Sequence, residues 1–245
     1  MTDVKVIQNI TAITMDSKRR ILTDAIIMFE GGKFISVDKA HAVDLPSDCE
    51  VIDGKGCIAM PGLIDTHAHA DQSLLRGLGD GLNWMPFLDE IIDPWLLQRE
   101  PSDATLANQL SMIEMLKNGT TCFVSPNVDP RDDFAALTKS VGDIGIRAVL
   151  GRFAMASENF SDMLAIMNRW HGTQSGLVDM WFGLDVPRRP GDIEYPDFYR
   201  SVKQESEKLG VGIVYHFCSE EEDAAYIARH FGKRPAEWSR DNHAL

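Results

Sequence analysis

The sequence has 245 residues, of which 44% are apolar and 25% charged, a composition typical of a soluble globular protein with a core of its own. Its formal net charge of −13 argues against nucleic acid and anionic membranes as partners, because phosphate groups select basic surfaces. No apolar run approaches the roughly 20 residues that span a bilayer, no signal-peptide pattern opens the chain, and the four cysteines lack CxxC spacing, so we expect a cytoplasmic protein with reduced thiols.

Residues 1–60 consist of short β-branched runs separated by turn signals, with no amphipathic helix of useful length. The segments EGGKF (30–34) and IDGKG (52–56) have the chemistry of hairpin turns, because glycine tolerates the positive φ that such turns need. We therefore expect residues 1–60 to form a small β subdomain.

After Pro61 the pattern changes to alternating strands and helices. Ser102 can cap a helix that ends at Asn118-Gly119 and whose predicted apolar face is Leu106, Leu110, Ile113 and Leu116. Further helices are predicted over about 131–144, 160–170 and 197–209. The strands between them are nearly continuous apolar runs, which indicates a parallel sheet covered by helices. Counting GLIDTH as the first, we expect five strands.

Five strands do not close a (β/α)₈ TIM barrel, which needs about 250 residues by itself. Only about 185 residues follow Pro61, and the chain stops in what we interpret as a connection toward a sixth strand. The barrel interpretation therefore assigns residues 61–245 to the first part of a barrel in a truncated chain. The rival is a complete open sheet, which the absence of a Gly-rich phosphate loop after the first strand disfavours.

The strongest chemical signal is PGLIDTHAHADQSLLRG, residues 61–77. His67 and His69 are two residues apart, so on a strand they project from the same face with Cα atoms about 6.5–7 Å apart. Two imidazoles in this arrangement can reach one ion at zinc–nitrogen distances of about 2.0–2.1 Å. An isolated HxH pair can also be two polar residues that simply end a strand. The metal-binding interpretation therefore depends on the surrounding sequence.

That context resembles the amidohydrolase superfamily. A β-rich leader, PGLIDTHAH, LLRGLGD, a helix and GTTCFVSP follow in the family's order, and the resemblance covers the whole chain. The branch that it resembles contains methylthioadenosine and adenosylhomocysteine deaminases, guanine deaminases and triazine hydrolases. The resemblance implies that the leader belongs to a small β-sandwich, and that His67 and His69 bind the metal.

The resemblance also implies a third ligand, His216, at the end of the fifth strand. A catalytic His on the sixth strand and a metal-binding Asp on the eighth would lie beyond Leu245. Two-metal members of the superfamily carry a carboxylated Lys on the fourth strand, and VDMWFGLDVP contains no Lys. We therefore expect one divalent ion, zinc, with iron as the alternative. Such an ion lowers the pKa of its water toward about 7 and supplies hydroxide.

Several positions depart from the family's deaminases. The Glu that usually follows the fifth-strand His by three residues is replaced by Ser219, and Glu220 is the nearest acid. Glu220 is a catalytic candidate. Successive residues of a strand face opposite ways, however, so Glu220 would point away from the face of the family's Glu, and we favour the interpretation that it begins a helix. Leu96 replaces a ribose-binding Glu, which puts adenosine-like substrates in doubt. The candidates for substrate binding, implied by the resemblance or by position, are Gln72, Trp84, Arg152 and Asp185.

We interpret the protein as a metal-dependent hydrolase acting on non-peptide C–N bonds, a deaminase of a nitrogen heterocycle. The alternative within the enzymes is displacement of halide from a similar ring, which would tolerate Ser219 because halide leaves without a proton. The alternative from another class is an inactive metal-binding fragment. The expected partner is a small-molecule substrate, and we expect neither nucleic acid nor a membrane. The sequence is compatible with a homo-oligomer.

Overall fold

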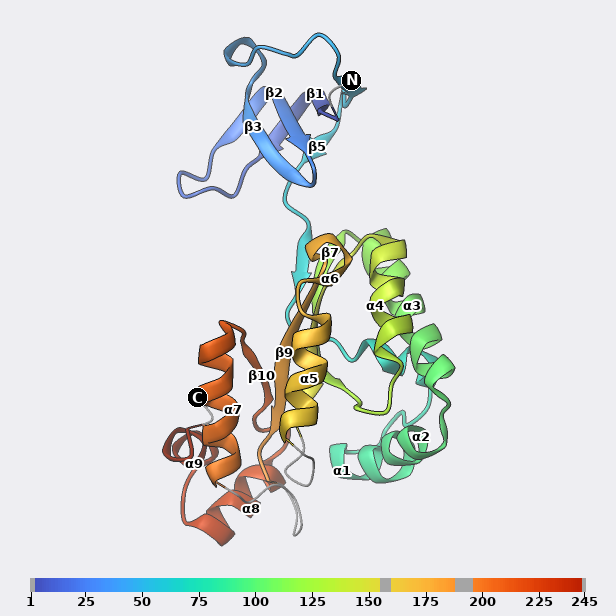
Figure 1. Cartoon of the computed structure of the whole chain (residues 1–245), viewed down its shortest axis with the longest axis vertical. Helices are drawn as coiled ribbons and strands as arrows, with labels where there is room; N and C mark the ends of the chain where they lie inside the picture. Colours follow the sequence, from blue (N-terminus) through green and yellow to red (C-terminus); the bar gives the residue numbers. More distant parts are fainter. Residues whose placement is uncertain (1–2, 155–159, 188–195, 244–245) are drawn as a thin grey trace. The chain divides into compact units, whose positions relative to one another are not determined.

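The structure, a computed structural model, describes residues 3–154, 160–187 and 196–243. The chain divides into two compact units, Met1–Gly62 and Leu63–Leu245. Figure 1 shows the first unit mainly as strands and the second as strands that alternate with helices. This division follows the change of pattern that the sequence shows at Pro61.

The first unit is one mixed sheet in the order β3-β2-β1-β4, with β5 also on β1. Its strands are β1 (Lys5–Ile13), β2 (Ile21–Glu30), β3 (Lys33–Lys39), β4 (Glu50–Asp53) and β5 (Ile58–Ala59), and η1 (Ala40–Ala42) follows β3. The predicted hairpin turn of EGGKF joins the antiparallel strands β2 and β3, with Gly31 and Gly32 at φ 56° and 75°.

The predicted hairpin at IDGKG is wrong. Both β4 and β5 pair with β1 in the parallel sense, so the loop between them returns the chain to the same neighbour. The Gly54 N–H donates to the Gln8 carbonyl at 2.9 Å, and the Cys57 N–H turns back onto the Gly54 carbonyl at 2.8 Å. The glycines therefore make a local kink beside β1, and the turn chemistry alone could not distinguish that kink from a hairpin.

The second unit contains five parallel strands whose spatial order, β10-β9-β8-β7-β6, follows the chain. They are β6 (Leu63–Asp65), β7 (Thr120–Val128), β8 (Arg147–Phe153), β9 (Val178–Asp185) and β10 (Ile213–His216). All five predicted strands are confirmed. A parallel sheet in chain order with helical crossovers is the arrangement of a (β/α)₈ barrel, of which these strands form a curled part.

The helices of the second unit lie beside its sheet (Figure 1). They are η2 (Ala70–Leu75), α1 (Trp84–Phe87), the π-helical turn η3 (Leu88–Ile92), α2 (Asp93–Gln98), α3 (Pro101–Lys117), α4 (Phe134–Ile144), α5 (Phe160–Trp170), α6 (Thr173–Gly176), α7 (Pro196–Leu209), α8 (Glu221–Phe231) and α9 (Pro235–Asp241). Among the described residues, no helix is long and apolar enough to cross a membrane.

The two faces of the curled sheet differ in what covers them. Leu150, Met180, Phe182 and Leu184 are fully buried in the main core, against the helices. Their neighbours Gly151 and Gly183 project the other way, where a Cβ at Gly151 would meet Val214 of β10. We call the side that carries Gly151, Gly183 and Val214 the inner face. Because residues two apart share a face, Asp185 and His216 also belong to the inner face.

Helix α3 buries a different face from the one predicted. Its buried residues are Ala104, Ala107, Asn108, Ser111 and Met112, whereas Leu106 and Ile113 are 54% and 47% exposed. Close packing of η2 explains the difference, because the hydroxyl of Ser111 donates to the Ala70 carbonyl at 2.8 Å. The helix also begins earlier than predicted, at Pro101, where Glu100 rather than Ser102 is the cap residue.

Candidate metal centre

His67 and His69 lie in the segment that directly follows β6. The backbone N–H of His67 donates to the Asp65 carboxylate at 3.1 Å. Between the two histidines, the Ala68 N–H donates to the Val124 carbonyl of β7 at 2.9 Å. This bond continues the pairing of β6 with β7 beyond the end of β6, and it holds the segment against the sheet. Both imidazoles are therefore anchored at the carboxyl end of the strands.

His216, the last residue of β10, meets the two histidines across the sheet. Its ring centroid lies 4.8 Å from that of His67 and 5.0 Å from that of His69. One ligand atom from each of the three rings can be chosen so that all lie within 4.8 Å of one another. Two nitrogen ligands of one tetrahedral zinc ion lie about 3.3 Å apart, and the Nε2 atoms of His69 and His216 are 3.0 Å apart. The three side chains therefore fit a single metal ion.

Burial lowers the pKa of two of the three imidazoles, those of His67 and His69. Desolvation, followed by the nearby His216 and His67 rings, lowers the pKa of His69 to about 4. Desolvation, followed by His216, also lowers the pKa of His67. A neutral imidazole offers a nitrogen lone pair, and a metal ion binds the deprotonated ligand. At neutral pH His67 and His69 are therefore in the protonation state that binds a cation.

Asp185 lies against one of these rings. Its Oδ1 atom is 2.7 Å from Nδ1 of His216. Only 22% of the Asp185 side chain and 9% of the His216 side chain are exposed. The sequence made Asp185 a candidate for substrate binding, and in the structure its carboxylate contacts His216.

Gln72 and Trp84 lie on the segment that follows the two ligand candidates. Gln72 is half-buried in η2, and its backbone N–H donates to the His69 carbonyl at 3.1 Å. Trp84 begins α1, and its indole Nε1 is buried with no hydrogen-bond partner among the described residues. A buried indole N–H usually finds a partner, so Trp84 has donor capacity that its protein neighbours leave unused.

Arg152 lies on the opposite face of the sheet from His216. It pairs with Phe182 in the register of β8 and β9, and both side chains are fully buried. Phe182 belongs to the core under the helices, so strand alternation directs Arg152 away from the inner face. Its guanidinium donates to the carbonyl of Phe153. These contacts favour a structural role for Arg152 over contact with substrate.

Glu220 immediately precedes α8, at the helix start that strand alternation favoured. The Asp223 carboxylate accepts the N–H of Ser219 at 2.7 Å and that of Glu220 at 3.4 Å, as in a capping box. The Glu220 carboxylate itself accepts the N–H of Met85 in α1 at 3.1 Å. Glu220 thus connects the start of α8 to the Trp84 segment.

Sequence reasoning missed a buried charge network beside the histidines. Arg99 forms ion pairs with Asp71 at 2.9 Å and with Asp132 at 2.8 Å, and all three side chains are 8% exposed or less. Burial raises the pKa of Asp71, and it raises the pKa of Asp132 to about 6. Asp71 and Arg99 are 28 positions apart and Arg99 and Asp132 are 33 positions apart, so no local spacing indicated the network. The only signal was an Asp two residues after His69.

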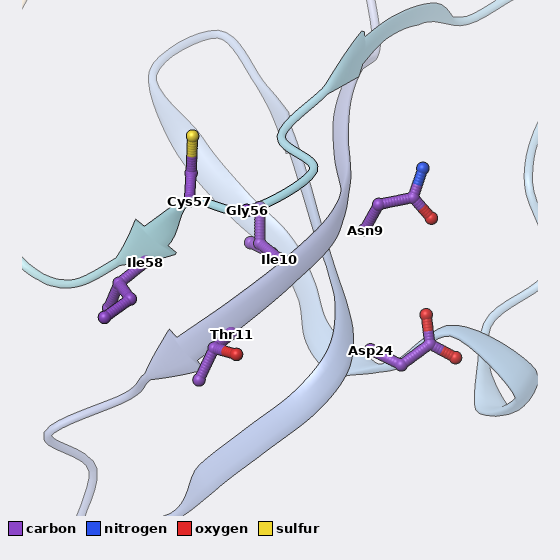
Figure 2. A pocket seen from close by; sticks show the side chains of 7 residues that line it. All are labelled: Asn9, Ile10, Thr11, Asp24, Gly56, Cys57 and Ile58. Carbon is purple, nitrogen blue, oxygen red and sulfur yellow. The ribbon is translucent and has the colours of Figure 1, made fainter.

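A separate hollow of about 340 Å³ lies in the first unit. Figure 2 shows the side chains that line it, Asn9, Ile10, Thr11, Asp24, Gly56, Cys57 and Ile58. It lies where the β1–β2 pairing shifts register, and Asn9 and Asp24 have φ of 61° and 49° there. The Asn9 amide donates to the Asp53 carboxylate at 2.9 Å. The hollow therefore follows from the irregular pairing, and its lining contains no group of metal ligands comparable with the three histidines.

Parallel strands with helical crossovers and a histidine cluster at their carboxyl ends define the class of (β/α)-barrel proteins with a candidate metal site. Within that class the chain belongs to the Amidohydrolase family, whose sequence profile matches residues 58–244. This membership confirms the family resemblance that the HAH motif and its context indicated.

Curated relatives and solved structures agree with this assignment. The chain is 30% identical over 220 residues to the 5-methylthioadenosine/S-adenosylhomocysteine deaminase of Desulfitobacterium hafniense, covering 86% of this chain and 47% of the relative. It superposes on zinc-complexed atrazine chlorohydrolase from Arthrobacter aurescens with TM-score 0.83 and 23% identity. This match covers 98% of this chain and 58% of the chlorohydrolase. The superposition on guanine deaminase from C. acetobutylicum has TM-score 0.77 and 21% identity, and it covers 99% of this chain and 60% of the deaminase. The chain thus spans about half the length of the curated relatives it matches.

Proposed function

We propose that the protein is a metal-dependent hydrolase of non-peptide C–N bonds, a deaminase of a nitrogen heterocycle, with His67, His69 and His216 holding one zinc ion. The observation that carries this proposal is the convergence of three imidazoles, with ligand atoms within 4.8 Å of one another, at the carboxyl ends of β6 and β10. Family membership and the deaminase relatives support the reaction class. The four free cysteines are consistent with the reducing cytoplasm that we expect.

The ligands that the described residues provide favour one metal ion over two. The fourth strand of the series, β9, reads VDMWFGLD and contains no lysine that could be carboxylated to bridge a second ion. Three imidazoles with one open position are a donor set that suits catalytic zinc, with iron as the alternative. When bound, such an ion lowers the pKa of water and makes a nucleophile available at neutral pH.

The substrate that we propose is a heterocycle without a ribose. The resemblance implies that nucleoside-type members contact substrate at positions 96, 185 and 219, which are Leu96, Asp185 and Ser219 in this chain. Leu96 cannot hydrogen-bond a hydroxyl, and Asp185 is engaged with His216. A site built to bind a substrate hydroxyl loses orders of magnitude in discrimination when such partners are missing.

One observation favours a second candidate, hydrolytic displacement of halide from a similar ring. Ammonia needs a proton in order to leave, whereas halide does not. The position where deaminases carry the proton-donating Glu is Ser219, and the nearby Glu220 carboxylate accepts the N–H of Met85. A site without a dedicated proton donor would suit halide as the leaving group.

The decisive experiment combines zinc titration with two product assays on the protein. We expect one zinc per chain, and His69→Asn or His216→Asn to weaken zinc binding by roughly 100-fold or more. His41→Asn, an exposed histidine of the first unit, is the matched control and should bind zinc normally. Release of ammonia from aminated purines or triazines supports deamination, and release of chloride from chlorinated triazines supports the second candidate. A protein that binds zinc and releases neither product would be the inactive metal-binding form.

A further inference from the structure

Asp185 and His216 form a shielded cross-strand pair. They are the last residues of β9 and β10 and lie opposite each other in the parallel register. Paired residues of adjacent strands project from the same face of a sheet. The 2.7 Å contact between Oδ1 and Nδ1 is therefore built into the register of the two strands rather than made by a long, flexible side chain.

The backbone on both sides of this pair is also held. The hydroxyl of Tyr199, a fully buried residue of α7, donates to the Asp185 carbonyl at 2.8 Å. The N–H of Val186 donates to the His216 carbonyl at 3.1 Å and extends the ladder past the end of β9. These two bonds limit how far Asp185 can move relative to the imidazole.

The pair determines which imidazole nitrogen carries the proton. A carboxylate only accepts hydrogen bonds, so Nδ1 of His216 must be the donor and Nε2 keeps its lone pair. Nε2 is the atom that faces the cluster, 3.0 Å from Nε2 of His69. Metal-binding histidines commonly give their second N–H to a carboxylate, which fixes the tautomer and the ring orientation.

We propose that Asp185 is a positioning residue that holds His216 in the Nδ1–H tautomer with Nε2 directed at the metal site. This proposal rests on the proposed function only in taking the ligand of Nε2 to be a metal ion. It differs from the substrate-binding role that the sequence indicated for Asp185, and it is supported by the 2.7 Å contact between the carboxylate and the imidazole.

The first test observes the tautomer in the metal-free protein and needs no zinc. Long-range ¹H–¹⁵N spectra of ¹⁵N-histidine protein, with His216→Asn used for assignment, should show His216 protonated at Nδ1. In Asp185→Leu the Nε2–H tautomer, which is ordinarily preferred, should become populated. Asp185→Asn keeps an acceptor oxygen and should retain the Nδ1–H form. Protonation of Nε2 in the unsubstituted protein at neutral pH would overturn the proposal without any variant at position 185.

The second test measures zinc affinity by competition with a chromophoric chelator. We expect Asp185→Leu to bind zinc roughly 10–100-fold more weakly, and Asp185→Asn to lie within a few-fold of the unsubstituted protein. Asp179→Asn is the matched control, because Asp179 lies on the same strand with 55% of its side chain exposed, and it should leave the affinity unchanged.

The outcomes separate this proposal from the proposed function. If the unsubstituted protein binds no zinc, the proposed function fails, while the tautomer spectra still decide the role of Asp185. If Asp185→Leu does not fold, as judged by its thermal unfolding, Asp185→Ala carries the same expectations. An unchanged tautomer together with unchanged zinc affinity in a folded Asp185→Leu or Asp185→Ala protein would overturn the positioning role.

Discussion

Arg99 and Asp71 form an ion pair of 2.9 Å in which both side chains are almost fully buried, 3% and 8% exposed. Asp71 is two residues from His69, and Arg99 also binds Asp132 in the connection between β7 and α4. One guanidinium thereby ties the segment that carries two ligand candidates to a connection on the next strand. Buried charges of this kind are stable only while they remain paired.

Arg99→Met should destabilise the protein strongly, because it leaves two buried carboxylates without their partner. We expect a loss of about 3–5 kcal/mol in the free energy of unfolding, measured by urea titration. The control is Arg76→Met, which removes an exposed ion pair with Glu114 and should change stability by less than about 1 kcal/mol. Equal effects of the two substitutions would show that the buried network contributes no more than a surface pair.

Ionisation of Asp132 should make stability fall as the pH rises from about 4 to about 6. Burial raises the pKa of Asp132 from 3.8 to about 6. Between these values the folded state keeps a proton that the unfolded state has lost, so unfolding is favoured by rising pH. The contribution is at most roughly 3 kcal/mol, since a difference of one in pKa corresponds to about 1.4 kcal/mol.

Asp132→Asn tests this pH dependence, because the amide does not ionise. Urea unfolding of both proteins at several pH values between 4 and 7 should show the variant gaining stability relative to the unsubstituted protein as the pH rises. A stability difference that stays constant over this range would mean that Asp132 has an ordinary pKa. A difference that moves the opposite way would mean that Arg99 lowers the pKa instead.

Gly183→Ala should disrupt the curl of the sheet. A Cβ at Gly183 would overlap the carbonyl oxygen of Pro126, a backbone atom of β7 that cannot move as a side chain would. Overpacking of this kind destabilises proteins by about 1–3 kcal/mol, and we expect the upper part of that range in thermal or urea unfolding. Gly142→Ala in α4 is the contrast, since the atoms nearest to its Cβ would belong to the flexible side chain of Gln174, and we expect less than about 1 kcal/mol.

Glu220→Gln should lower the hydrolytic rate by a few-fold at most. Glu220 precedes α8 and accepts the Met85 N–H at 3.1 Å, and glutamine keeps an acceptor oxygen for that bond. Steady-state rates would be compared at equal zinc content. A loss of roughly 10²–10⁴-fold with zinc retained would identify Glu220 as the general acid after all. Ser219→Glu, which restores the family's residue, should then compensate in part.

The sequence by itself determined the local elements and the ligand candidates. Strand length, helix caps and glycine stops predicted all five strands of the second unit, because these signals act within one element. Helix α4 is an example, with the Asp133 carboxylate capping its first turn and Gly145 in the left-handed conformation at its end. His67 and His69 were found by their spacing, and His216 by the family resemblance.

The tertiary structure alone decided which surfaces and side chains meet. Helix α3 turns Leu106 outward and places small residues such as Ala107 against η2, where the Ser73 hydroxyl donates to the Ala107 carbonyl at 2.7 Å. The partnership of Asp185 with His216 depends on the register of two strands, and that of Glu220 with Met85 joins residues 135 positions apart. Such contacts depend on the distance and register between whole elements, and no local pattern of residues encodes those quantities.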